Sequence, residues 1–221
     1  MILAAVAVLA QPALAEDPNL STRPQGGSGS AAQLYLAELA YAAALRQGEV
    51  LPLLAAIRLA REVTLRPATG WEKVPSGEVP TDASVVPDIV PDPASEAALT
   101  IARNLAGEDP DLQDLVFDLD AQTPGGRTQT AVEARSELGP GQTDTWRLPL
   151  FGEVAAEIAL IDDGGGPLAV ALADDAGAVV CAHPASAGPA LCRLTPARNG
   201  FFTLTVQNAG ETVVRYRLIG N

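Results

Sequence analysis

The chain has 221 residues, 48% of them hydrophobic, which is enough to bury the core of one large domain or two small ones. Asp and Glu total 27 against 14 Lys and Arg, so the formal net charge at pH 7 is −13. The phosphates of nucleic acids and anionic lipid surfaces repel so acidic a chain, and we therefore expect no nucleic-acid partner.

Residues 1–15 have the pattern of a secretory signal peptide. An apolar run at 2–10 is followed by Pro12 and by a small-x-small triplet at 13–15, which predicts cleavage before Glu16. A buried helix is the alternative, but the proline and the acidic residues that follow fit it poorly. The run is too short to span a bilayer, and no other stretch approaches the length of a transmembrane helix. We therefore expect an exported protein, periplasmic or secreted, with no membrane span after signal removal.

Helical patterns follow a leader at 16–30, which is rich in Gly, Ser and Pro and is expected to be flexible. Apolar residues recur at helical spacing over 31–47, with Gly48 at the C-cap, and again over 49–66. These two segments predict a helical hairpin. Because the hairpin is rich in Ala, which buries little area, we expect it to pack on another part of the protein.

A proline-rich connector at 67–93 separates the hairpin from two further helices. Its prolines exclude a helix or a central strand. Within it, Trp71 is interpreted as an apolar anchor that docks the connector on a domain, with a ligand platform as the alternative. Asp-Pro pairs at 92–93 and 109–110 are helix start signals, and they predict a third helix and a short fourth one. The predicted helical region therefore spans 31–120.

The hydrophobic period changes from 3.6 to 2 near Asp144, after a linker predicted at 121–142. Runs of alternating apolar and polar residues, separated by Gly and Asp turns, fill 143–221. Strands with one apolar face are expected to pack as two sheets. The predicted fold class is therefore α+β, a small N-terminal helical region followed by a C-terminal antiparallel β-sandwich of about seven strands.

Cys181 and Cys192 are the two cysteines of the chain, and they lie close together near its end. In an exported protein, a close and isolated pair favours a disulfide. A metal site would need more soft ligands, since His183 is the only histidine. We therefore predict a Cys181–Cys192 disulfide and no metal or cofactor site.

Several stretches of the C-terminal region together carry a family resemblance. They are an opening strand at 144–148, a corner at 151–155, a run at 168–181 that ends in Cys181, then Cys192, and closing strands at 200–208 and 216–218. These stretches resemble the bacterial pre-peptidase C-terminal domain, a small β-sandwich found after secreted peptidases and in other exported proteins. The resemblance covers about a third of the chain. It implies a sandwich fold and a module whose motifs are structural.

Paired aspartates in two turns could in principle bind calcium. Relatives of this domain often carry an Asp-x-Asp-Leu string at the start of the third strand, but residues 166–169 contain no acid here. Asp162, Asp163, Asp174 and Asp175 remain in adjacent turns. Paired Asp before Gly is typical of solvated hairpin turns, which is our interpretation, with a weak cation site as the alternative.

The sequence carries no recognisable catalytic constellation. His183 lies beside a predicted disulfide cysteine and directly before Pro184, and no Gly-x-Ser-x-Gly, His-Glu-x-x-His or phosphate-binding loop is present. Chance alone makes some carboxylate pair near-certain among 27 acidic residues, but no pair stands out. Phe201 and Phe202 are adjacent in a strand, so one must point outward. Phe201 is the candidate contact residue, although we expect a helix of the first region to cover it.

These patterns predict a non-enzymatic exported binding or assembly module whose partner is another exported protein or an envelope component. An envelope hydrolase, or an accessory subunit of one, is the alternative. A further alternative is a chaperone-like partner of another exported protein that docks through the helical hairpin. An apolar groove on the helical hairpin would favour docking, and a buried carboxylate pair in a cleft would favour an enzyme.

Overall fold

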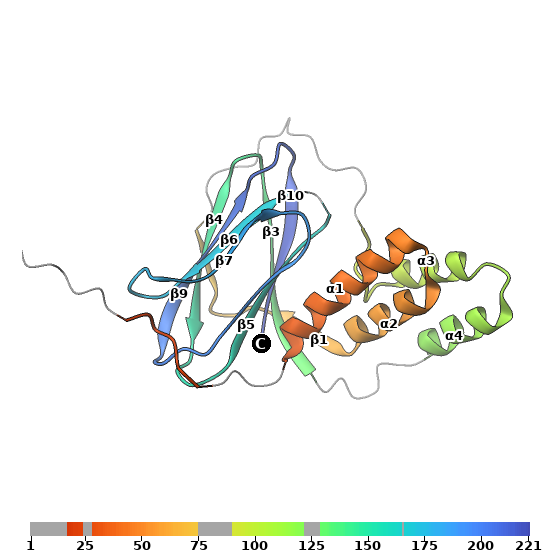
Figure 1. Cartoon of the computed structure of the whole chain (residues 1–221), viewed down its shortest axis with the longest axis horizontal. Coiled ribbons are helices and arrows are strands. Elements are labelled where there is room, and N and C mark those ends of the chain that lie inside the picture. Colours follow the sequence, from red (N-terminus) through yellow and green to blue (C-terminus); the bar gives the residue numbers. More distant parts are fainter. Residues whose placement is uncertain (1–16, 24–27, 75–89, 122–128, 165) are drawn as a thin grey trace, which may run out of the picture.

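The computed structural model describes residues 17–23, 28–74, 90–121, 129–164 and 166–221. The predicted signal peptide and most of the predicted connector lie outside these residues. Figure 1 shows a β-sandwich with a group of helices beside it. No helix in the described parts of the chain has the length and apolar character that crossing a membrane requires.

Four helices form the described part of the N-terminal region. Gly48 ends the first one in the left-handed conformation, with φ 68°, which a residue without a Cβ adopts readily. The start predicted for the third helix at Asp92–Pro93 was wrong by three residues: Ser95 is its N-cap, and the Ser95 hydroxyl accepts a hydrogen bond from the Ala98 N–H at 3.2 Å. The helices are α1 (Ser30–Gln47), α2 (Val50–Arg61), α3 (Glu96–Ala106) and α4 (Pro110–Ala121).

The predicted α+β class and the strands after residue 143 are confirmed. The strands of that part are β4 (Thr143–Leu150), β5 (Ala156–Asp162), β6 (Leu168–Ala173), β7 (Val179–Ser186), β8 (Ala190–Leu194), β9 (Gly200–Asn208) and β10 (Val214–Gly220). Together with three earlier strands they form two five-stranded sheets. Sheet A has the order β1-β3-β10-β5-β8, and sheet B has the order β2-β4-β9-β6-β7.

The prediction was wrong for three segments that add strands to the sandwich. The end of the second predicted helix is β1 (Val63–Pro67), the predicted connector contains β2 (Glu72–Val74), and the predicted linker at 121–142 contains β3 (Gln129–Leu138). β1 runs parallel to β3, and β2 extends the edge of sheet B beside β4. The helix signal in 49–66 therefore ends at Arg61, because the chain leaves the helix to enter sheet A.

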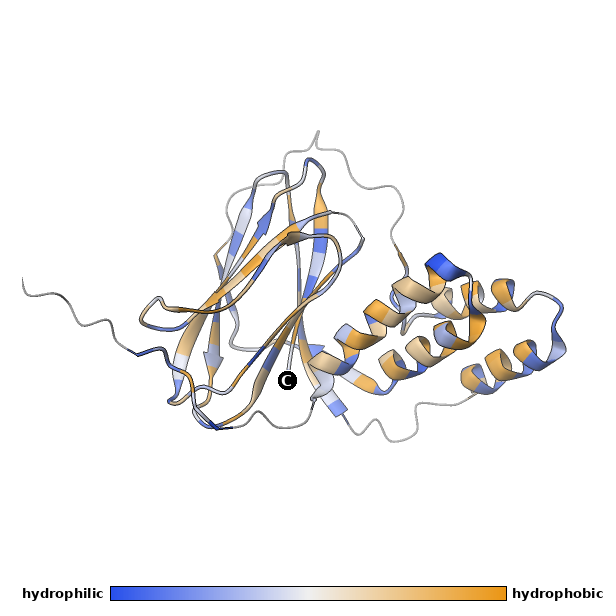
Figure 2. Cartoon of the chain, viewed as in Figure 1, coloured by the Kyte–Doolittle hydropathy of each residue, from blue (hydrophilic) through white to orange (hydrophobic). Residues whose placement is uncertain are grey.

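The main core lies between the two sheets, as a period of two predicts. Trp146, Phe202 and Tyr216 supply its aromatic rings, and Val, Leu and Ile fill the space around them. Figure 2 shows the resulting alternation of hydrophobic and hydrophilic residues along the strands.

α1 packs on the outer face of sheet A, and α2, α3 and α4 pack mainly against other helices. Ala31, Leu34 and Ala37 of α1 lie in one buried cluster with Ala159 and Ile161 of β5. The alanines let α1 approach the sheet closely, and this contact supplies the surface that the hairpin alone lacks. A second cluster holds the four helices to one another; its largest members are Tyr41, Leu53, Ile57, Leu99 and Val116.

Phe201 lies on the outer face of sheet B, which none of the helices in the described residues covers, so the expectation of a covering helix was wrong. Its side chain is 44% exposed, and the Arg147 guanidinium carbon lies 3.3 Å from the ring centroid. α1 packs on sheet A because that sheet presents apolar residues outward, including Ile161 and Ile219.

The two sheets are held together at both edges of the sandwich, by a disulfide at one edge and by a tryptophan at the other. The predicted disulfide is confirmed: the sulfurs of Cys181 on β7 and Cys192 on β8 lie 1.97 Å apart and join the edge strands of the two sheets. At the opposite edge, Trp71 packs against the core between β1 and β2, as the anchor interpretation predicts. A Cβ on Gly220 would meet the Trp71 ring at 2.7 Å, so glycine is required for this close approach.

Candidate functional site

The disulfide occupies the one cluster of close-lying metal ligands found in the described residues. Ligand atoms of Cys181, His183 and Cys192 lie within 4.8 Å of one another, but the two sulfurs are bonded together. His183 Nε2 lies 2.9 Å from the Leu191 carbonyl oxygen. The histidine therefore links β7 to the start of β8, which is a structural role.

Asp174 is buried and holds its own turn together. Its Oδ1 accepts hydrogen bonds from the N–H groups of Ala176 and Ala178 at 3.0 and 2.8 Å, and its Oδ2 accepts one from Asn19 N–H at 2.7 Å. Burial tends to raise the pKa of this carboxyl, but the backbone donors and Arg198 outweigh burial, and the pKa lies below its usual value. The interpretation as a solvated turn was therefore wrong for Asp174.

The four turn aspartates do not converge. Asp162 and Asp163 lie at the end of β5, whereas Asp174 and Asp175 follow β6, so the length of β6 separates the two pairs. Within the described residues, no three acidic side chains lie close enough to share a metal ion. This arrangement differs from the converging shell of oxygens that calcium requires.

Residues 17–23 lie against the sandwich, so the prediction of a flexible leader was wrong for this part of it. Asn19 is fully buried; its Oδ1 accepts a hydrogen bond from the Arg198 N–H at 2.9 Å, and its Nδ2 donates to the Arg198 carbonyl at 3.1 Å. Ser21 N–H donates to the Thr195 carbonyl at 2.7 Å. The Gly and Ser content of the leader predicted flexibility, and nothing in that pattern indicated that Asn19 would be buried.

We expect Asn19→Ala to release residues 17–23 and to lower the free energy of unfolding by about 1–2 kcal/mol, because the buried side chain loses its two hydrogen bonds to the Arg198 backbone. Urea denaturation measures the stability, and hydrogen exchange at the Ser21 amide reports the release. Ser21→Ala is the control; it removes two exposed contacts, with Glu153 at 3.4 Å and with the Arg23 N–H at 3.3 Å, and should change stability by less than about 0.5 kcal/mol. Equal effects of the two substitutions would contradict the anchor.

Asp144 lies at the centre of a buried polar network near one sandwich edge. Its Oδ2 accepts hydrogen bonds from Tyr216 Oη at 2.6 Å and from Ser136 Oγ at 2.7 Å, and it pairs with Lys73 Nζ at 2.9 Å. Burial, together with the hydrogen bond to Asp144, raises the pKa of Tyr216 well above its usual value. Trp146 Nε1 donates to the same Tyr216 hydroxyl at 2.8 Å.

Ser136 and Lys73 lie in hydrogen-bond contact, and a serine beside a lysine is one form of activated nucleophile. Such a lysine must act as a neutral base. Here the Asp144 carboxylate pairs with the ammonium group and also accepts a hydrogen bond from the Ser136 hydroxyl. The arrangement therefore ties β2 to the sandwich through the ion pair between Lys73 and Asp144.

Arg217 forms a buried charged cluster between the helices and sheet A. Its guanidinium pairs with Glu38 of α1 and with Asp92, which precedes α3, and lies 3.7 Å from Glu133 of β3. Burial raises the pKa of Glu38 from its ordinary 4.5 to about 7, although Arg217 offsets part of the effect. Each carboxylate faces the guanidinium and no reacting group, so the cluster serves to hold α1 on the sheet.

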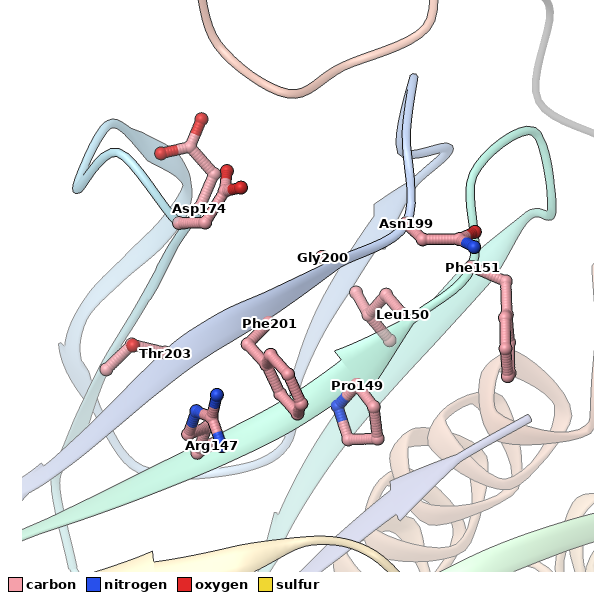
Figure 3. Close-up of a pocket in the computed structure, with 10 residues that line it drawn as sticks. Arg147, Pro149, Leu150, Phe151, Asp174, Asn199, Gly200, Phe201 and Thr203 are labelled. Atoms are coloured by element: carbon pink, nitrogen blue, oxygen red, sulfur yellow. The ribbon is translucent and has the colours of Figure 1, made fainter.

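An open hollow of about 620 Å³ lies on the uncovered face of sheet B. Figure 3 shows Phe201 and Pro149 side by side on neighbouring strands, with Arg147 next to the Phe201 ring and Phe151 at one end. The Arg147 guanidinium covers Phe201 and also pairs with Glu72 at 3.3 Å. Because its arginine and its most central ring already contact each other, this hollow is a weaker candidate for a binding site.

A groove between α2 and α4, about 310 Å³ in volume, is the stronger candidate. Leu51 on one wall is 58% exposed and Leu115 on the other is 45% exposed. Isolated exposed leucines are ordinary, but two facing rows of apolar residues mark a contact surface. The groove is lined by Leu51, Leu54, Ala55 and Arg58 of α2 and by Leu115, Asp118 and Leu119 of α4.

Sequence reasoning named the helical hairpin as a docking face but did not find this groove. Each helix taken alone shows one apolar stripe, and α4 reads as a short, acidic surface helix. The groove exists because α4 packs beside α2 and not end to end with it. Buried contacts of Val116 and Leu119 with the other helices hold α4 in this position.

No protein-family model matches the chain, and no curated protein matches it. Among solved structures, the pre-peptidase C-terminal domain of a collagenase from Bacillus anthracis is 17% identical, with a TM-score of 0.34 over 40% of this chain and 87% of that chain. A de novo designed double-stranded β-helix is 10% identical, with a TM-score of 0.28 over 40% of this chain and 97% of that one. A family GH115 4-O-methyl-α-glucuronidase is 10% identical, with a TM-score of 0.30 over 40% of this chain and 14% of that one. At TM-scores of 0.28 to 0.34, these likenesses assign the chain neither a family nor a function.

Proposed function

We propose that this protein is a non-enzymatic, exported binding or assembly module that holds another exported protein through its helical region. The observation that carries the proposal is the apolar groove between α2 and α4. The sandwich then serves as the scaffold, closed by a disulfide of the kind that persists in oxidising compartments.

The alternatives fit the described residues less well. An envelope hydrolase would need a pair of carboxylates free to act in a cleft, whereas Glu38 and Asp92 both pair with Arg217. A chaperone-like protein would dock through the α1–α2 hairpin, but α1 is largely committed to sheet A and to the other helices. The exposed apolar surface of the groove instead involves α2 and α4.

Capture from an envelope extract tests the docking function. The double variant Leu51→Gln, Leu115→Gln makes both groove walls polar, and we expect it to capture the partner at least about tenfold less than the unchanged protein does. Leu36→Gln, Leu39→Gln is the matched control, because both leucines are exposed on α1 outside the groove. Circular dichroism checks that both variants remain folded.

A partner lost with the groove variant and retained with the control supports the proposal. Equal capture by the unchanged protein and the groove variant would refute the groove as the docking site, and so would the absence of any partner.

A further inference from the structure

We propose that the groove between α2 and α4 binds an amphipathic helix whose polar face is basic, supplied by an exported partner. This inference rests on the proposed docking function and names the chemistry of its partner.

The shape of the groove favours a helix. On α2, the lining residues Leu51, Leu54, Ala55 and Arg58 recur at i, i+3, i+4 and i+7, which is one face of a helix. On α4, Leu115 and Leu119 repeat the same spacing. Two parallel rows of this kind accept a third helix that inserts an apolar stripe between them, as in helix-in-groove recognition.

The charge along α4 selects a basic partner. This helix contains four aspartates and no basic residue, and Asp111, Asp114 and Asp118 are exposed to solvent. Asp120, by contrast, is paired with Arg103 at 2.6 Å. On the α2 wall, Arg58 lies 3.4 Å from Glu62. Lysine or arginine on the polar face of a bound helix would therefore meet carboxylates along α4.

The charge of the whole molecule points the same way. A net charge of −13 attracts a cationic partner at long range and opposes a second copy of this chain. A dimer through the groove would also need basic residues opposite α4, and Arg58 is the one base among the lining residues described. A basic partner is therefore favoured over self-association.

Two synthetic peptides with the same leucine stripe, one with lysine and one with glutamate on the polar face, provide the probes. Fluorescence anisotropy should show binding of the leucine–lysine peptide alone, weakening as salt is added. We expect Leu51→Gln, Leu115→Gln to weaken this binding by about tenfold or more. Asp111→Asn, Asp114→Asn, Asp118→Asn should weaken it by at least about fivefold and reduce its salt dependence.

The control for net charge removes three exposed carboxylates elsewhere: Glu72→Gln, Glu137→Gln, Glu211→Gln. This variant should bind the basic peptide within about twofold of the unchanged protein. Equal weakening by the two triple variants would mean attraction by net charge alone, which overturns the inference. So would binding that is insensitive to the groove substitutions.

Two further outcomes overturn the inference while leaving the docking function intact. One is preferential binding of the leucine–glutamate peptide. The other is a dimer, seen by light scattering after gel filtration, that dissociates in Leu51→Gln, Leu115→Gln. The proposed docking function itself would instead be refuted if the groove variant captured its partner from the envelope extract as well as the unchanged protein does.

Discussion

Arg217→Met is expected to lower the free energy of unfolding by about 3–5 kcal/mol, because removal of one partner leaves buried charges without compensation. The Arg217 guanidinium is only 9% exposed, and it faces Glu38, Asp92 and Glu133. Methionine fills a similar volume, so the loss reflects charge more than packing. Urea denaturation at neutral pH measures the change.

Arg215→Met is the matched control. Arg215 lies on the same strand and the same face, but it is 45% exposed and pairs with Glu137, which is 47% exposed. Exposed pairs of this kind contribute about 0–1 kcal/mol. A similar loss from both substitutions would show that the buried cluster does not set the contact between α1 and sheet A.

For Arg215 and Arg217, the sequence predicts the strand face but not the burial of each side chain. A period of two places Arg215 and Arg217 together on the outer face of β10, and the structure confirms this. The same pattern cannot show that α1 and Asp92 cover one arginine and leave the other in water. That difference depends on contacts between residues that are far apart in the chain.

Strand β3 was missed for a related reason. Its outward residues include Glu133, Arg135 and Glu137, and its inward residues include Ala134 and Ser136, so the hydrophobic alternation is weak. Its parallel partner β1 lies far away along the sequence and ends in Pro67, the first proline of the predicted connector. The strands with strong alternation, β4 and β9 above all, were predictable because Val, Leu and Phe alternate there with polar residues.

The candidate groove could not be predicted from the sequence either, because it depends on tertiary contacts. The apolar stripes of α2 and α4 were visible as helical periodicity, whereas the aspartates of α4 drew no inference from the sequence. Which flank of each stripe stays exposed depends on how the helices pack around Tyr41 and Leu99. Sequence patterns therefore supplied the apolar character of the surface, and the fold supplied its shape.

Glu38 makes the free energy of unfolding depend on pH. Burial raises its pKa to about 7; Arg217 lowers it, and Asp92 and Asp162 raise it further. Between its ordinary 4.5 and about 7, the folded protein therefore holds a proton that the unfolded chain releases. The free energy of unfolding contributed by Glu38 is then largest below pH 4.5 and falls as the pH rises through about 7.

We expect Glu38→Gln to remove this dependence, because glutamine resembles the protonated carboxyl and can still accept a hydrogen bond from Arg217. The stability of the variant relative to the unchanged protein should increase by about 2–3 kcal/mol between pH 5 and pH 8. The comparison cancels carboxylates that do not interact with Glu38, such as Asp163, whose pKa burial also raises. Glu62→Gln, on exposed α2 surface, is the control and should leave the pH profile unchanged. Parallel profiles for the unchanged protein and Glu38→Gln would mean that Glu38 is already ionised at pH 5 in the folded state, and the cluster would then be a simple ion pair that holds its charge throughout this range.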